Sequence, residues 1–160
     1  IKALCIYMSF YILMNIGIFG IILSLKNNNN FIEKIYDFSG LSKHKPLMAL
    51  SVAIIMLSMA GIPPFAGFFG KFYIFVAAIK ADLLMLAILG VISSVISAFY
   101  YLKIIKIMYF DESENSQFKS VMNSQSSILL VIVMLFISLF IFYPSILTIV
   151  STNIGIEYFR

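Results

Sequence analysis

Apolar residues gather into four long segments along the chain, separated by polar stretches. A helix that crosses a membrane needs about 20 predominantly apolar residues, and each segment reaches that length. The segments cover residues 3–25, 46–79, 83–110 and 127–150. The pattern therefore predicts an all-α fold, a polytopic bundle of transmembrane helices that forms a single membrane domain over residues 1–160.

The composition supports a membrane protein and argues against several other classes. Hydrophobic residues make up 62% of the chain and charged residues 11%, with a mean hydropathy of +1.04, whereas soluble domains are about 45–50% apolar and about 25% charged. The net charge is +4, but the lysines are dispersed beside apolar segments, so we expect no nucleic-acid partner. The single cysteine, Cys5, and the single histidine, His44, give no basis for a disulfide, an iron–sulfur site or a metal cluster.

The polar connections differ in length and character. The connection 26–45 begins with a run of asparagines and then carries apolar residues near helical spacing, which favours a short interfacial helix. Those apolar residues are Phe31, Ile35 and Phe38. The connection 80–82 is short, so the segments on either side should form a tight antiparallel pair. The connection 111–125 is polar and is expected to be an exposed loop.

The lysine distribution predicts an orientation in the membrane. Seven lysines lie in or beside the two long connections, against two lysines and one arginine on the opposite side. The first set is Lys26, Lys34, Lys43, Lys45, Lys103, Lys106 and Lys119, and the second is Lys2, Lys80 and Arg160. Positive residues favour the cytoplasmic side, so we expect a multi-pass protein of the bacterial inner membrane with periplasmic termini and cytoplasmic long loops.

The second apolar segment contains a helix-breaking sequence near its middle. Pro63 lacks the N–H that would bond the carbonyl of Met59, and Pro64 lacks the one that would bond Ala60. Gly61 weakens the helix at the same point. We therefore predict a discontinuous helix, broken near 61–64, of the kind with which transporters build ion sites. A simple proline kink is the alternative.

Lys71 is the one charged residue in this second segment. Helical side chains lean toward the N-terminus, so its ammonium should lean over Gly67, which leaves space there, toward the break. A charge inside a membrane is costly and marks a candidate functional site, and a lysine can exchange a proton where an arginine cannot. Lys71 is thus the candidate proton relay, and the alternative is a lysine that snorkels to the outer interface. No carboxylate falls in the predicted helices, so any acidic partner must come from elsewhere.

Three further features of the sequence have candidate roles. His44 could relay protons from the cytoplasm or cap an interfacial turn, and Lys103 could border a water path or anchor its helix in the cytoplasm. A row of small residues in the third segment is typical of close helix packing in lipid. That row is Gly90, Ser94 and Ala98.

The sequence around the break resembles a known family. The run LSMAGIPPFAGFFGKFY over residues 57–73 is similar to subunit N of bacterial NADH-quinone oxidoreductase, an antiporter-like subunit of respiratory complex I. Residues 11–20, 44–46 and 100–103 fit the same family. The resemblance extends over essentially the whole chain, which matches only the C-terminal four-helix portion and so looks like a fragment of a larger subunit.

The resemblance implies a role and a set of partners. Lys71 would correspond to the lysine of an outward half-channel, and this non-redox subunit would translocate protons, with no catalytic activity from the chain alone. NADH and quinone would be used elsewhere in the complex, so this chain would bind no cofactor. The partners would be neighbouring membrane-arm subunits and the lipid bilayer. There are two alternatives: a subunit of a related multisubunit cation/proton antiporter, or a purely structural membrane segment.

Overall fold

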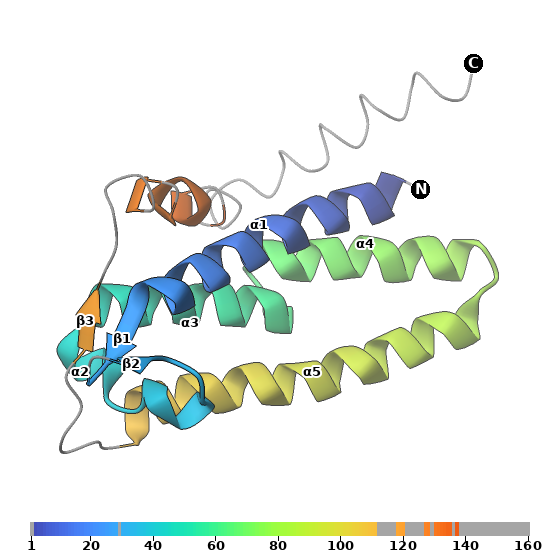
Figure 1. Cartoon of the computed structure of the whole chain (residues 1–160). Coiled ribbons are helices and arrows are strands. Elements are labelled where there is room, and N and C mark those ends of the chain that lie inside the picture. Colours follow the sequence, from blue (N-terminus) through green and yellow to red (C-terminus); the bar gives the residue numbers. More distant parts are fainter. Residues whose placement is uncertain are drawn as a thin grey trace.

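The computed structural model is mostly helical, with its long helices side by side (Figure 1). It describes residues 2–28, 30–111, 118–120, 127–128, 130–135 and 137. The α-helices are α1 (Lys2–Ser24), α2 (Leu41–His44), α3 (Pro46–Ala60), α4 (Ala66–Lys80) and α5 (Leu84–Phe110). The helical class expected from the apolar segments is thus confirmed, and α1 and α5 occupy the segments predicted as 3–25 and 83–110.

Two of these helices have the length and hydrophobicity of membrane spans. They are the part of α1 from Tyr7 to Ser24 and the whole of α5. α3 and α4 have 15 residues each, which corresponds to a rise of about 22 Å. Figure 1 shows α3 and α4 following one another in the same direction, against α1 and α5, which run the opposite way. Residues 61–65 between them are not helical.

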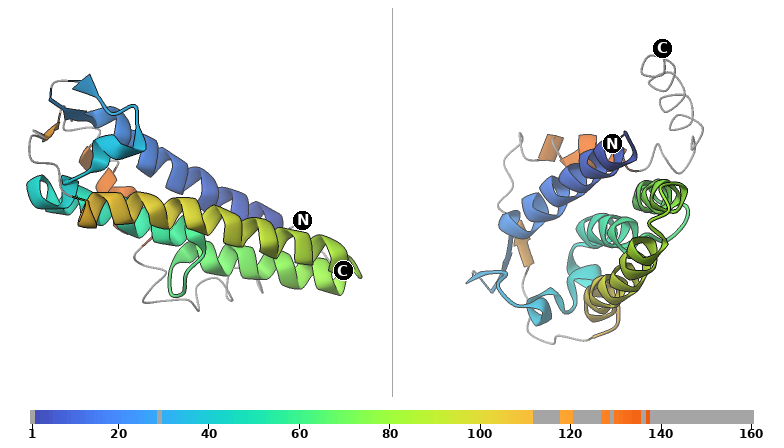
Figure 2. Two further views of the ribbon diagram at one scale, coloured as in Figure 1. Left: turned by 90° about the horizontal axis from the view of Figure 1, so that it is seen from below. Right: turned by 90° about the vertical axis from the view of Figure 1, so that its right-hand side faces the viewer.

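The described part of the predicted fourth span, 127–150, is helical at residues 127–128, 130–135 and 137. The rest of this span lies outside the described residues, as does Arg160. The left view of Figure 2 shows the long helices lying lengthwise beside one another, and the right view looks roughly along their axes. α3 packs against both α1 and α5, and α4 packs against the same two helices.

A small antiparallel sheet was not expected from the sequence. Strand β1 (Leu25–Asn27) directly continues α1 and pairs with β2 (Asn30–Phe31) and with β3 (Phe118–Ser120), in the order β2-β1-β3. The pairing gives backbone groups beyond the end of α1 their hydrogen-bond partners. It also ties the connection 26–45 to the connection 111–125, so Phe118 is buried rather than part of an exposed loop.

The interfacial helix expected around Phe31, Ile35 and Phe38 is likewise corrected. The structure has β2 followed by a single 3-10 turn, Ile35–Phe38. The carboxylate of Asp37 accepts the backbone N–H groups of Glu33 and Lys34 at 3.0 and 2.8 Å. These bonds cap the start of the turn at Ile35, so Phe31 lies outside it, and Gly40, with φ +77°, separates the turn from α2.

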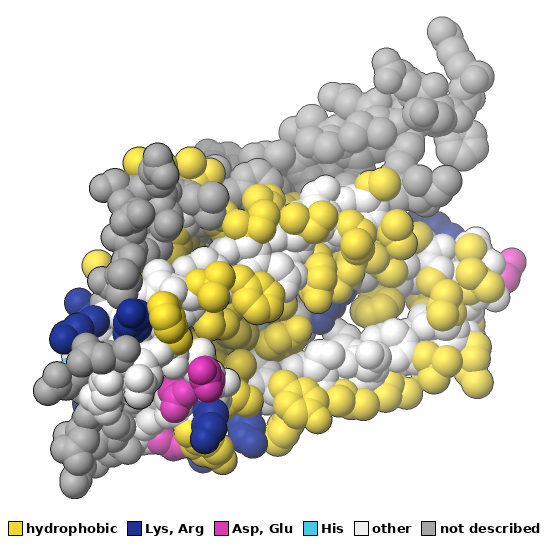
Figure 3. Space-filling model, viewed as in Figure 1, with side chains coloured by type: hydrophobic (Ala, Val, Ile, Leu, Met, Phe, Trp, Pro, Cys, Tyr) yellow, Lys and Arg dark blue, Asp and Glu magenta, His cyan; other side chains and the backbone are white. Residues whose placement is uncertain are grey.

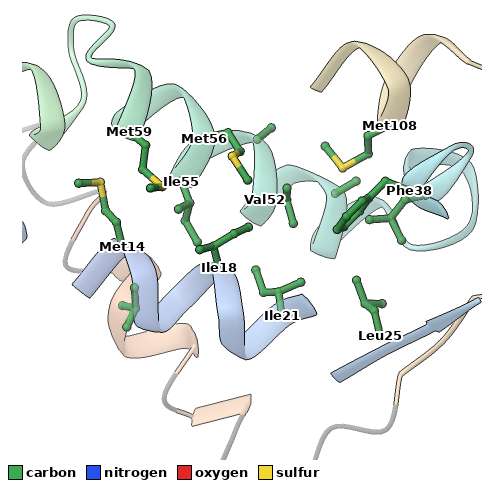
Figure 4. Close-up of a cluster of buried hydrophobic side chains, with 14 of the residues drawn as sticks. Met14, Ile18, Ile21, Leu25, Phe38, Val52, Ile55, Met56, Met59 and Met108 are labelled. Carbon is green, nitrogen blue, oxygen red and sulfur yellow. The ribbon is translucent and has the colours of Figure 1, made fainter. Parts of the chain in front are cut away.

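The hydrophobic core lies mainly between α1 and α3 (Figure 4). Side chains at helical spacing on each helix point toward the other. α1 and β1 contribute Met14, Ile18, Ile21 and Leu25, and α3 contributes Val52, Ile55, Met56 and Met59. This packing fixes α3 against α1 and so holds the end of α3 in place for the site described below.

Charged side chains are concentrated at one end of the molecule. Figure 3 shows lysines gathered around the small sheet and hydrophobic side chains along the helices. The seven lysines that the sequence groups with the long connections lie in or directly beside β1, the 3-10 turn, α2, β3 and the C-terminal part of α5, whereas Lys80 ends α4 at the opposite end. The distribution is that of a membrane protein with one strongly basic face.

Candidate functional site

The site begins at the C-terminal end of α3. Gly61 has φ +85°, and its N–H bonds the carbonyl of Ser58 at 3.0 Å, while the N–H of Ile62 bonds the carbonyl of Leu57 at 3.2 Å. These two bonds form a Schellman motif, the common glycine-based helix ending. The motif satisfies the carbonyls of Leu57 and Ser58, but the next two, of Met59 and Ala60, have no backbone partner among the described residues.

Lys71 supplies the partner for both of these carbonyls. Its side chain extends from α4 to the end of α3, where the ammonium nitrogen Nζ donates to Met59 O at 2.9 Å and to Ala60 O at 3.2 Å. A third bond reaches the hydroxyl oxygen of Ser94 on α5 at 2.7 Å. An ammonium has three N–H donors, and all three are satisfied here. The carbonyl end of a helix also carries partial negative charge, which stabilises a cation.

The two carbonyls are those whose helical donors are replaced by prolines in the sequence. Pro63 and Pro64 cannot bond Met59 and Ala60, and the ammonium of Lys71 does so instead. Lys71 also lies in the second turn of α4 and not at its end. Its amine therefore turns inward to α3 and α5, which disagrees with a lysine that snorkels to the outer interface.

Gly61 and Gly67 have different structural reasons to be glycine. Gly61 adopts a left-handed conformation that L-residues disfavour, and a Cβ there would lie 3.1 Å from Cδ of Lys71. Gly67 allows α4 to approach α3, because a Cβ at this position would collide with the carbonyl oxygen of Ser58. This corrects the expectation that Gly67 leaves space for the lysine. The space is filled by the backbone of α3.

Ser58 connects the two short helices. Its side chain is fully buried, and its Oγ accepts the N–H of Gly67, near the start of α4, at 3.0 Å. The residue that precedes α4, Phe65, offers no side-chain cap of its own. Ser58 therefore satisfies one of the free N–H groups that every helix start carries, and does so from a neighbouring helix.

We expect Ser58→Ala to destabilise the protein by about 1–3 kcal/mol, because the buried N–H of Gly67 would lose its acceptor. The midpoint of thermal unfolding of the purified protein in detergent measures this loss. Ser9→Ala is the matched control, since Ser9 is exposed and bonds only the carbonyl of Cys5 on its own helix. An exposed change of this kind should stay within about 0.5 kcal/mol. Equal midpoints for the two variants would show that Ser58 does not cap α4.

Two cavities border the contact between Lys71 and Ser94. One, of about 210 Å³, carries hydroxyl groups on its wall, and the other, of about 260 Å³, is mostly apolar. The hydroxyl groups of the first cavity belong to Tyr7, Ser93, Ser94 and Ser97. Lys71 and Ser94 line both cavities, so the hydrogen bond between them lies at the boundary.

The structure does not bring the other two candidate residues to Lys71. His44 is exposed at the end of α2, with its ring 5.9 Å from that of Phe118, and the whole of α3 separates it from the site. Lys103 is exposed on α5, nine residues after Ser94 (103 − 94 = 9), or about 13 Å along the helix. Within the described residues, no group of three His, Cys, Asp or Glu side chains could hold a metal ion.

The sequence pattern does not mark Ser58, and it marks Ser94 only as one of a row of small residues for helix packing. The structure gives each a hydrogen bond to the site. Ser94 does lie 23 residues from Lys71, and a helical hairpin with a short turn brings such positions level with each other. That turn, 80–82, is visible in the sequence and was the available signal. No comparable pattern marks Ser58.

Comparison with known proteins shows the family of the chain. A family model described as NADH:quinone oxidoreductase/Mrp antiporter, TM, matches residues 1–97. The chain belongs to this family. Its members are transmembrane proteins by that description, in agreement with the composition and with the two helices long enough to cross a membrane.

Curated members of the NADH:quinone oxidoreductase/Mrp antiporter family are close to the chain in sequence. NADH-quinone oxidoreductase subunit N of Rhodospirillum rubrum is 51% identical over 113 residues, which cover 71% of this chain and 23% of the relative. That of Pelagibacter ubique is 53% identical over 116 residues, with 72% and 25% covered. NADH-ubiquinone oxidoreductase chain 2 of Marchantia polymorpha is 41% identical over 156 residues, with 98% and 32% covered.

A solved structure shows the same arrangement of helices. Respiratory complex I from Thermus thermophilus with bound aureothin contains a chain that matches with a TM-score of 0.74 and 26% identity. The match covers 90% of this chain and 33% of that chain. This chain therefore spans about a quarter to a third of the length of the family members that it matches.

Proposed function

We propose that this chain forms part of a proton-translocating membrane subunit of an NADH:quinone oxidoreductase, with Lys71 as a proton relay. The observation that carries the proposal is the position of the Lys71 ammonium, which bonds two carbonyls at the end of α3 and a hydroxyl on α5 beside a cavity. Support from relatives comes from subunit N proteins at 51% and 53% identity. The subunit itself would carry no redox centre.

α3 and α4 together would form one discontinuous transmembrane helix. Each is about 22 Å long, too short for the roughly 30 Å hydrocarbon core of a bilayer. In succession, with a five-residue connection between them (61–65), they are long enough. Non-helical backbone inside a membrane is tolerated where protein or a water-filled cavity surrounds it. The bonds from Lys71 and Ser58 satisfy free backbone groups on either side of the break, and Pro63 and Pro64, which are exposed in this chain, would meet neighbouring subunits or water.

A lysine at such a break can hold and release a proton. The charged form is stabilised by three oxygen atoms, all of them uncharged. Burial in an apolar membrane opposes the charge. A change in the charge of a neighbouring group could therefore shift the balance between the ammonium and the neutral amine. In the assembled complex, that group would belong to another part of the membrane arm, and quinone reduction by NADH elsewhere would drive its change.

The same proposal gives the orientation. The basic end with the small sheet would face the cytoplasm of a bacterium, and the connection between α4 and α5 would face the periplasm. The Lys71 site would then open toward the outer side, as a half-channel for proton release. NADH and quinone would bind to other subunits, and the apolar surface of α5 would meet lipid or neighbouring membrane subunits.

The proposal is tested by purifying the complex that contains this chain. We expect an affinity tag on this protein to recover a complex that oxidises NADH, reduces quinone and, in proteoliposomes, acidifies the lumen. The dye-detected proton gradient should disappear when a protonophore is added. A family relationship to Mrp antiporters makes cation/proton exchange the other candidate. Recovery of a complex that exchanges Na⁺ for protons and lacks NADH oxidation would refute the proposal in favour of that candidate.

A further inference from the structure

We propose that Ser94 is the group through which a proton leaves Lys71. This inference rests on the proposed function and adds a second residue to the proton path. The ammonium touches three oxygen atoms, from Met59, Ala60 and Ser94. Two of them are carbonyl oxygens, which accept hydrogen bonds and cannot donate them. The Ser94 hydroxyl alone among the three can both accept a proton and donate one.

The chemistry of the two protonation states of Lys71 requires such a group. The ammonium has three N–H donors, and the neutral amine has two together with a lone pair. After loss of a proton, the two carbonyls can still accept the two N–H groups. The third partner must then change from acceptor to donor, to satisfy the lone pair. A serine hydroxyl does so by rotating about its C–O bond, so Ser94 complements both states of the lysine.

The transfer balances with a single water molecule. A proton moves from Nζ of Lys71 to Oγ of Ser94, while the original hydroxyl proton of Ser94 moves to a water in the adjoining cavity. Lys71 becomes the neutral amine, Ser94 remains a neutral hydroxyl that now donates to Nζ, and the water becomes hydronium. No oxidant or further reactant is needed. Rotation of the hydroxyl and uptake of a new proton by the amine restore the starting state.

The cavities beside Ser94 favour one side for this water. The cavity of about 210 Å³ is lined by three further hydroxyl-bearing residues, Tyr7, Ser93 and Ser97. The Ser97 hydroxyl donates to the carbonyl of Ser93 at 2.9 Å and can still accept a hydrogen bond, and an ordered water takes about two to four polar partners. The cavity of about 260 Å³ has a mostly apolar wall, with Val91, Val95 and Ala98 on α5. Among the described residues, the hydrogen bond of Ser94 is the one it accepts from Lys71, so its own proton is free to bond such a water.

The test compares threonine with valine at position 94. The two side chains have nearly the same shape, but only threonine carries a hydroxyl, and Ser94 borders open space on two sides. The variants are measured as assembled complexes in proteoliposomes, by proton uptake per NADH oxidised and by the ratio of pumping rates in H₂O and D₂O. We expect Ser94→Thr to pump within about twofold of the unmodified complex. Loss of a proton-transfer group typically costs about 10²–10⁴-fold in its step, so Ser94→Val should lose at least about tenfold.

A matched pair controls for the mere presence of a β-branched residue in a helix. Ser51 lies on α3, away from the site, and its hydroxyl bonds the carbonyl of Leu47 on the same helix. Ser51→Thr and Ser51→Val should pump alike. The isotope ratio should rise in Ser94→Val alone, because a packing defect would lower the amount of assembled complex without changing that ratio.

The possible outcomes separate this inference from the proposed function. Equal pumping by Ser94→Thr and Ser94→Val, whether both are normal or both are weak, would overturn the role of the hydroxyl. If the two Ser94 variants pump equally but Lys71→Ala loses pumping under the same conditions, the proposed function stands and only the role of Ser94 is refuted. If Ser94→Val does not assemble, Ser94→Ala, which removes the hydroxyl and adds no bulk, replaces it in the comparison. Normal pumping by Lys71→Ala would overturn both proposals.

Discussion

Lys71→Ala is expected to remove nearly all proton pumping by the assembled complex. The alanine has no group that can take or give a proton, and it leaves the carbonyls of Met59 and Ala60 without the donor that they have in the protein. Loss of a general acid or base slows its step by about 10²–10⁴-fold, and a single interrupted step stops the transfer of protons along the whole route. The proposed function couples proton movement to quinone reduction, so NADH oxidation by sealed vesicles should fall as well.

Lys71→Arg should not restore the rate, although it restores the charge. An arginine stays protonated under all conditions that proteins experience, so it can fill the three-oxygen site without releasing a proton. Lys80→Ala is the matched control, since Lys80 is an exposed lysine at the end of the same helix. Pumping is measured by dye quenching in proteoliposomes, with the amount of assembled complex determined in the same preparation. An assembled Lys71→Ala complex that pumps at the normal rate would refute the role of Lys71.

Gly67→Ala should be the most destabilising single-methyl substitution at the site. The added Cβ would collide with the backbone carbonyl of Ser58, and backbone atoms cannot move aside as the end of a flexible side chain can. Added bulk in a close-packed region costs about 1–3 kcal/mol, and more where backbone must shift, so we expect about 3 kcal/mol or more. α4 would also move away from α3, and the Lys71 ammonium would then lose its hydrogen bonds to the carbonyls of Met59 and Ala60.

Gly20→Ala provides the matched control for this prediction. Gly20 lies in α1, and a Cβ there would meet nothing within 4 Å. Alanine is favoured over glycine in a helix by about 0.5–1 kcal/mol, so this variant should be as stable as the unmodified protein or more so. Thermal unfolding in detergent measures stability, and proteoliposome assays measure pumping. A Gly67→Ala protein with an unchanged midpoint would contradict the close contact between α3 and α4.

The long helices and the break between α3 and α4 could be predicted because they depend on local sequence. Uninterrupted apolar residues predicted α1 and α5, and two prolines with a glycine predicted where helical bonding must stop. The prolines also identified Met59 and Ala60 as the carbonyls that need new donors, because the missing N–H groups lie at a fixed spacing along a helix. The direction of the Lys71 side chain followed from the general lean of helical side chains toward the N-terminus.

Other features depended on contacts between distant residues. The pairing of β1 with β3 joins residues 25–27 to 118–120, and neither short strand has a pattern of its own that would predict it. The interfacial helix expected near Phe31 was wrong because Phe31 pairs with Lys26 in the sheet, and the Asp37 carboxylate caps a helical turn that starts only at Ile35. The function assigned to Gly67 was wrong for a related reason. Its neighbour is a backbone carbonyl of α3, which no spacing in the sequence indicates.

The sequence by itself determined the membrane class, the helical segments, the position of the break and the one lysine beside it. Only the tertiary structure decided which faces of the helices are buried, that Ser94 and the end of α3 surround the ammonium, and that Ser58 caps α4. The physical reason is that these helices are apolar on all sides. In a soluble protein a polar stripe marks the outer face of a helix, but here the hydrophobic pattern gives no preference, and close packing of particular side chains makes the choice.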